Sequence, residues 1–158
     1  MKEKKTNAMR MLESAGIPYT EHVYDASDGH IDAVSVAAKC GMDPAMVFKT
    51  LVTAGSDREH YVFVIPAENE LDLKKCAKAA GVKNVEMIPV KELLPLTGYI
   101  RGGCSPVGMK KQFRTFFDET AILFDTIYVS GGKIGLQIEA SVDSLLKITG
   151  GSMADLTR

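Results

Sequence analysis

The residues with the greatest capacity for chemistry lie in a glycine-rich segment at positions 97–114, TGYIRGGCSPVGMKKQFR. Gly102, Gly103 and Gly108 can adopt positive φ or allow another group to approach the backbone closely. A loop of this kind can direct several backbone N–H groups toward one point, as anion nests and oxyanion holes do. Its glycine spacing matches neither a P-loop nor a dinucleotide-binding fingerprint. The alternative is a loop that only connects two strands, because most loops do no more.

Lys49 is the second candidate, because it interrupts the apolar run VFKTLV at 47–52, whose composition predicts a strand. Such a lysine either faces solvent, the ordinary outcome on the wet face of an antiparallel sheet, or is held in a site. The three histidines lie far from the glycine-rich segment in sequence, so no nucleophile–base–orienter triad is evident. Peptidase and esterase motifs are also missing from the sequence. The candidate groups are therefore suited to binding a ligand and polarising it, and none is an obvious nucleophile.

The three cysteines, Cys40, Cys76 and Cys104, are widely scattered and form no CxxC pair. This spacing predicts neither a disulfide framework nor a zinc site, and a reducing cytoplasm is the simplest compartment. We expect packing roles for all three cysteines. We expect no metal and no cofactor.

Composition and charge restrict the class of protein. The chain has 158 residues, 46% of them hydrophobic and 25% charged, which predicts one domain spanning residues 1–158. The formal net charge of −1 excludes a broadly basic nucleic-acid coat, but a local cluster of Lys110, Lys111 and Arg114 remains a candidate for phosphate contacts. No apolar run approaches the ~18 residues of a membrane span, and the N-terminal segment predicts a helix rather than a signal peptide.

The chain mixes helical and strand patterns irregularly, which favours a single α+β domain with a mixed, mostly antiparallel sheet. Helices are predicted at 6–15, 32–40, 71–80, 90–96 and 142–150. Strands are predicted at 17–24, 47–52, 60–66, 85–88, 126–130 and 135–139. The short tail at 152–158 is expected to fray.

Five blocks in the same order resemble the YbaK family of Cys-tRNA(Pro) deacylases across nearly the whole chain. They are VFKTLV at 47–52, ELDLKK at 70–75, TGYIRGGCSPVGMKK at 97–111, TIYVSGGKIGLQIE at 126–139 and LLKITGGSMADL at 145–156. Members of that family are free-standing relatives of the editing domain inside some prolyl-tRNA synthetases. They hydrolyse the ester between a wrong amino acid and the terminal adenosine of tRNA(Pro). The resemblance implies a strongly curved mixed sheet, partly closed like a barrel and surrounded by helices.

The resemblance also implies roles for individual residues. The essential lysine of the family falls on Lys49, and a pocket-lining tyrosine falls on Tyr24. The glycine that donates a backbone N–H falls on Gly102, beside Gly103, and the serine of the VSGG hairpin falls on Ser130. These positions agree with the chemistry of the residues, because an ester carbonyl needs donors aimed at its developing oxyanion.

The expected function is therefore a trans-editing hydrolase for mischarged Cys-tRNA(Pro). Two alternatives remain: the same fold acting on another amino acid such as alanine, or a non-catalytic module that holds an RNA end or a protein partner. Because the family chemistry needs no protein thiol, Cys104 is assigned to structure, and the substrate's own thiol is the expected nucleophile. The near-neutral charge predicts weak binding of tRNA alone, with help from prolyl-tRNA synthetase.

Overall fold

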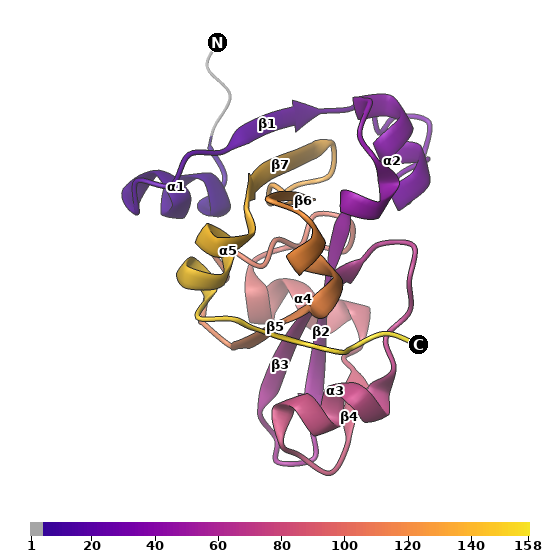
Figure 1. Cartoon of the computed structure of the whole chain (residues 1–158), viewed down its shortest axis with the longest axis vertical. Coiled ribbons are helices and arrows are strands. Elements are labelled where there is room, and N and C mark those ends of the chain that lie inside the picture. The colour runs from indigo at the N-terminus through magenta and orange to yellow at the C-terminus, as the bar shows by residue number, and fades with distance from the viewer. Residues whose placement is uncertain (1–4) are drawn as a thin grey trace.

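The computed structural model describes residues 5–158 and contains eight strands in two sheets (Figure 1). The smaller sheet has the order β1 (Thr20–Val23), β7 (Leu136–Ser141), β6 (Thr126–Ser130). The larger sheet has the order β4 (Val85–Met87), β2 (Phe48–Gly55), β3 (His60–Pro66), β5 (Arg114–Asp118), β8 (Ser152–Ala154). Only the β3–β5 and β5–β8 pairs are parallel. The prediction of a mixed, mostly antiparallel α+β fold is confirmed.

The two sheets share one core but do not close into a complete barrel. A single parallel bridge between Val47 and Tyr128 links them. The core cluster combines Phe48 and Phe117 of the larger sheet with Ile138 of the smaller one, and all three are almost completely buried. Closure is therefore partial, as the resemblance implied.

Five helices surround the sheets, and each lies within two residues of its predicted range. They are α1 (Asn7–Ser14), α2 (Ala33–Cys40), α3 (Leu73–Ala80), α4 (Val90–Thr97) and α5 (Val142–Thr149). Their ends follow local signals, as α2 illustrates. The Asp32 carboxylate accepts a hydrogen bond from the Ser35 backbone N–H at the start, and Gly41 takes φ +67° at the end. None of the helices described within residues 5–158 is long and apolar enough to cross a membrane.

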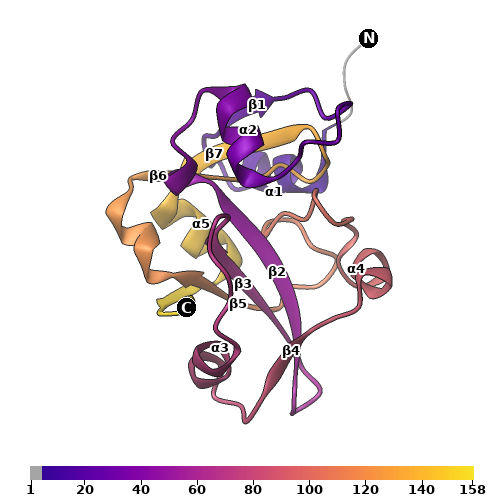
Figure 2. The ribbon, with the colours of Figure 1, turned by 90° about the vertical axis from the view of Figure 1, so that its right-hand side faces the viewer.

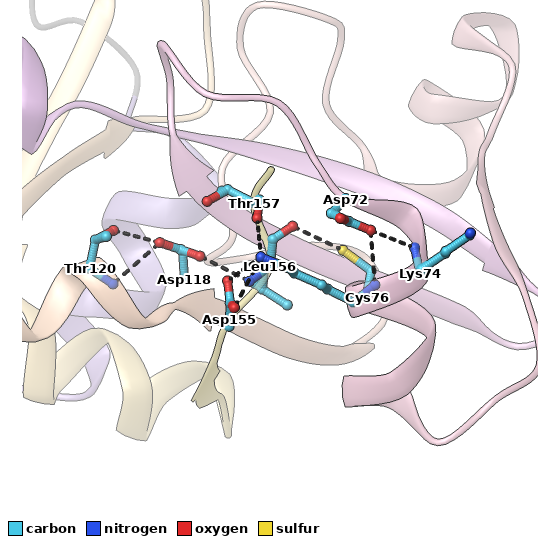
Figure 3. Close-up of polar contacts among 9 residues, drawn as sticks. Asp72, Lys74, Cys76, Asp118, Thr120, Asp155, Leu156 and Thr157 are labelled. Carbon is cyan, nitrogen blue, oxygen red and sulfur yellow. Dashed lines mark hydrogen bonds and ion pairs between the residues drawn. The ribbon is translucent and has the colours of Figure 1, made fainter.

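The expectation that the C-terminal tail frays is wrong. Strand β8 pairs with β5, and Leu156 beyond it is fully buried. The Leu156 N–H donates to the Asp118 carboxylate, and its carbonyl oxygen accepts from the Cys76 thiol (Figure 3). Lys75 of α3 forms an ion pair with Asp155. The tail thus joins α3 to strand β5 of the larger sheet.

Strand β5 was not predicted from the sequence. Phe116 and Phe117 are both buried because both faces of β5 are covered. Phe116 stacks on Phe63 with ring centroids 5.5 Å apart, whereas Phe117 belongs to the core between the two sheets. A strand covered on both faces lacks the polar–apolar alternation that identifies a strand in a sequence.

The larger sheet has an open edge along the first half of β2. Strand β3 pairs with β2 over its full length, whereas β4 pairs only with Thr53–Gly55. The bonds Ala67 N–H to Val47 carbonyl and Gly55 N–H to Glu59 carbonyl show that alternate residues of β2 bond to β3. The backbone groups of Phe48 and Thr50 therefore face the open edge. Figure 2 shows β2 running between the β6 region and β4, with α4 beside it.

Candidate functional site

A cavity of about 910 Å³ lies along the open edge of β2. Its walls come from β2, the segment around the start of α2, the β4–α4 connection, the glycine-rich segment and the ends of β6 and β7. Cavities of a few hundred to a thousand Å³ with a few convergent polar groups are the usual form of small-molecule sites. This cavity is the candidate site of the protein.

Four of the five residues predicted for catalysis or substrate binding line this cavity: Tyr24, Lys49, Gly102 and Ser130. They come from four segments that are far apart in sequence. Gly103, the fifth, does not line the cavity. The fold thus brings four candidate residues from separate sequence motifs together in one cavity.

Lys49 is half-buried on β2. Burial lowers the pKa of its ammonium group, and the nearby Glu70 carboxylate acts in the opposite direction. Partial removal from water strengthens the interaction of a cation with a negative charge, because the local dielectric is lower. Lys49 thus contributes a half-buried cationic side chain to the lining of the cavity.

The paired glycines have different surroundings. Gly102 takes φ +87°, and a Cβ at this position would lie 3.1 Å from Ile31 Cδ1. Gly103 donates its N–H to the Ile100 carbonyl oxygen at 3.0 Å, and a Cβ there would lie 2.9 Å from the Lys133 backbone. The N–H of Gly103 is therefore already used within the loop. Gly103 allows the close approach of the hairpin at residues 131–135, while Gly102 borders the cavity.

Tyr24 and Ser130 are almost fully buried cavity residues held by backbone bonds. The Tyr24 N–H donates to the Gly135 carbonyl oxygen at 2.9 Å. The Ser130 hydroxyl accepts the Gly132 N–H at 3.2 Å. A serine hydroxyl that accepts one bond still has its proton to donate, so Ser130 can offer a donor to a ligand.

Lys39 of α2 fixes the loop at 25–32, part of which lines the cavity. Its ammonium group donates to the Asp25 and His30 carbonyl oxygens at 2.6 and 2.9 Å and pairs with the Asp28 carboxylate at 2.8 Å. A single lysine thus holds this loop against α2.

Sequence reasoning did not single out two polar residues of the cavity, Thr50 and Gln137. Their side-chain oxygens Oγ1 and Oε1 are buried and have no hydrogen-bond partner among the described residues. A polar residue in an alternating strand ordinarily faces solvent, but Gln137 is only 7% exposed. Unpaired buried oxygens are costly, and here they face a cavity that can hold a donor. A polar residue inside a predicted strand was the only available signal.

The Cys104 thiol also lines the cavity. Burial raises its pKa to about 12, and the hydrogen bond with Thr97 acts in the opposite direction. The thiolate is the nucleophilic form of cysteine, so a thiol held neutral is poorly suited to attack. Cys40, Cys76 and Cys104 are all free.

The three cations predicted to contact phosphate do not line the cavity. Lys110 and Lys111 are exposed. Arg114 donates to the Ala80 carbonyl oxygen at 3.1 Å, and its guanidinium lies 5.3 Å from the centroid of the Phe116 ring. Arg101, which the sequence analysis did not select, is exposed and lines the cavity.

The chain is similar to known proteins in both sequence and structure. The family described as the aminoacyl-tRNA editing domain matches residues 30–148. EbsC of Enterococcus faecalis, a candidate Cys-tRNA(Pro)/Cys-tRNA(Cys) deacylase, is 50% identical over 155 residues, which cover 98% of this chain and 94% of EbsC. The crystal structure of a candidate trans-editing enzyme for prolyl-tRNA synthetase superposes with a TM-score of 0.85 at 26% identity and covers 99% of both chains. A hypothetical protein of known structure, 23% identical with a TM-score of 0.87, covers 96% of this chain and 99% of its own and shares the fold.

Proposed function

The chain belongs to the aminoacyl-tRNA editing domain family, and from that premise we propose that it is a trans-editing deacylase that hydrolyses Cys-tRNA(Pro). The observation that carries the proposal is the single cavity that joins Lys49 and Gly102 with Tyr24 and Ser130. Similarity to EbsC supports a cysteinyl ester as the substrate.

In this proposal Lys49 and Gly102 stabilise negative charge. The Gly102 N–H donates to the oxyanion that forms at the ester carbonyl, and the Lys49 ammonium holds an anionic or polar oxygen of the substrate. Donors fixed in advance at developing charge each contribute on the order of 100-fold or more in rate. Ser130 donates its hydroxyl proton to the substrate, Tyr24 forms the wall, and Gly103 shapes the loop behind Gly102.

The nucleophile is the thiol of the substrate, because the cavity offers no suitable one. A cysteine thiol has an ordinary pKa of about 8.5, and a nearby cation lowers that value and raises the thiolate fraction. After losing its proton to solvent, the sulfur attacks its own carbonyl carbon. The bond between that carbon and the ribose oxygen breaks, and the ribose oxygen takes a proton. The products are free tRNA and cysteine thiolactone, which water then opens to cysteine.

Thr50 and Gln137 orient the aminoacyl group. Their unpaired oxygens are acceptors, and the α-amino group of an aminoacyl ester supplies N–H donors of the complementary kind. This contact fixes the thiol relative to the carbonyl, and such positioning can supply several kcal/mol in an intramolecular reaction.

The proposed substrate selection lies in the amino acid rather than in the tRNA. A mechanism that needs the substrate sulfur reads the acyl group directly, and the name of EbsC includes both Cys-tRNA(Pro) and Cys-tRNA(Cys). Discrimination between tRNAs would then come from a partner. We propose prolyl-tRNA synthetase for that role and the cytoplasm, where tRNA is charged, as the compartment.

A deacylation assay tests the proposed function. Purified protein is incubated with preformed Cys-tRNA(Pro) and, in parallel, with Pro-tRNA(Pro), and the amino acid retained on the tRNA is followed. Release of cysteine well above the rate without enzyme, with proline retained, is the expected result. Equal loss of both amino acids would contradict selection for cysteine. Loss of neither would contradict the deacylase activity and favour the non-catalytic binding module.

A further inference from the structure

The cavity is long and has two chemically different ends. It follows β2 from Phe48 to Val52, a span of roughly 13 Å at about 3.3 Å per residue. The bridge between Val47 and Tyr128 brings β6 to one end, where Ser130 and Gln137 lie. The Ile88 N–H donates to the Val52 carbonyl oxygen and closes the other end with the β4–α4 connection.

The lining residues at the β4–α4 closure are apolar. They are Val52, Met87, Ile88, Val90 and Leu93. Met87 is 46% exposed and Val90 is 59% exposed, so this end opens to solvent. None of these five side chains can donate or accept an ordinary hydrogen bond, in contrast to the polar end.

We propose that the apolar end binds the 3′-terminal nucleoside of the tRNA, with the base lying against Met87 and Val90. This inference rests on the proposed function. Because the amino acid is esterified to the terminal ribose, that nucleoside must lie next to the reacting carbonyl. A cysteinyl group at the polar end leaves most of the roughly 910 Å³ for the nucleoside.

The chemistry of this end fits the face of a nucleobase rather than its edges. Every base presents an apolar π-face, and contacts to that face tolerate changes of base. The methionine thioether is polarizable and makes favourable contacts with aromatic rings. Since the lining side chains cannot read the base edges, this subsite accepts a guanine as well as an adenine.

A substrate analogue tests the subsite without catalysis. The probe is 3′-cysteinylamino-3′-deoxyadenosine, in which an amide replaces the ester, and its affinity is measured by calorimetry. The double variant Met87→Gln/Val90→Gln should bind it about tenfold more weakly, the scale expected for losing contact with one base. The guanosine analogue should bind the wild-type protein with similar affinity.

The controls separate the subsite from general damage. Both substituted side chains are partly exposed, and glutamine is a good helix former at the first position of α4. Ile122→Gln changes a side chain that is 74% exposed and lies outside the cavity, and it should leave the affinity unchanged. A baseless probe, 3′-cysteinylamino-3′-deoxyribose, should bind the wild type and the double variant equally.

Three outcomes would overturn the subsite: no binding of the probe to the wild type, equal affinity of wild type and double variant, or an equal loss with the baseless probe. Failure of the proposed function looks different. A protein that binds the probe through Met87 and Val90 but releases no cysteine from Cys-tRNA(Pro) retains the subsite and loses the deacylase activity.

Discussion

Lys49 is the residue with the greatest predicted effect on activity. Partial burial lowers the pKa of its ammonium group. The residue lines the same cavity as Gly102. Lys49→Ala should therefore reduce single-turnover deacylation of Cys-tRNA(Pro) by at least ~100-fold, the scale for one lost charge stabiliser. Because Lys49 is only half-buried, circular dichroism and thermal unfolding should show an intact fold. Near-normal activity in such a folded variant would remove Lys49 from the site.

The pH profile of Lys49→Arg separates charge from structure. As pH rises through the lowered pKa of Lys49, the wild type loses its cation earlier than an exposed lysine would. The rate, corrected for spontaneous hydrolysis, should therefore fall on the alkaline side. Arginine stays protonated in proteins, so whatever activity Lys49→Arg retains should lack this alkaline fall. A fall at the same pH in the variant would assign the titration to another group.

Cys104 is predicted to be dispensable for chemistry. Burial raises the pKa of its thiol to about 12, which keeps the sulfur neutral and unreactive near pH 7. Cys104→Ser should retain most of the activity, and iodoacetamide should modify Cys104 slowly in the folded protein. A folded but inactive serine variant, combined with inactivation of the wild type by modification at Cys104, would require a protein nucleophile.

Prediction of the site from sequence depended on what each residue signals by itself. Lys49 and the glycines were visible as unusual residues in their segments, and the resemblance added Tyr24 and Ser130. Gln137 was missed because an alternating strand predicts one wet face, whereas β7 lies between β1 and β6 and is covered on both faces. Burial by distant segments has no local signature in a sequence.

At the level of elements, local sequence signals predicted the helices. The strands that were not predicted depend on pairing with distant segments. Helix α2 was predictable because its cap residues stand next to it in the sequence. Strands β5 and β8 were missed because their parallel partners are remote, and parallel pairs need long connections. The open edge of β2, which forms one wall of the cavity, also depends on where β4 stops pairing, and a sequence does not reveal that point.

The C-terminal tail should contribute strongly to stability. The Asp118 carboxylate is 1% exposed and accepts bonds from the Leu156 N–H and from Thr120. Asp118→Ala leaves the buried Leu156 N–H unpaired, so we expect a loss of about 1–3 kcal/mol in the free energy of unfolding. Asp118→Asn, which keeps an acceptor, should lose less. Urea denaturation measures both, and an unchanged midpoint for Asp118→Ala would show that the tail is not needed for stability.

On the scale of the whole molecule, a net charge of −1 makes the position of each cation important. Arg101 lines the cavity, whereas Lys110, Lys111 and Arg114 lie outside it. Neutralising the latter three together should weaken tRNA binding and flatten its salt dependence, since each lost phosphate contact removes about one released counterion. Arg101→Gln alone should also weaken binding of tRNA. Filter binding at several salt concentrations checks both variants, and an unchanged salt slope in the triple variant would assign that cluster to a solvated surface.

The central claim is that the substrate's own sulfur attacks the ester in this cavity, and one comparison tests it most directly. Single-turnover deacylation rates are measured for cysteinyl-tRNA(Pro) and seryl-tRNA(Pro) at matched concentrations of wild-type protein. The two acyl groups differ in one atom and little in size, but a hydroxyl is far less ionised than a thiol near neutral pH. The account predicts rapid release of cysteine and severely slowed release of serine. Equal rates would mean that water or a protein group attacks, and would contradict the substrate-thiol mechanism.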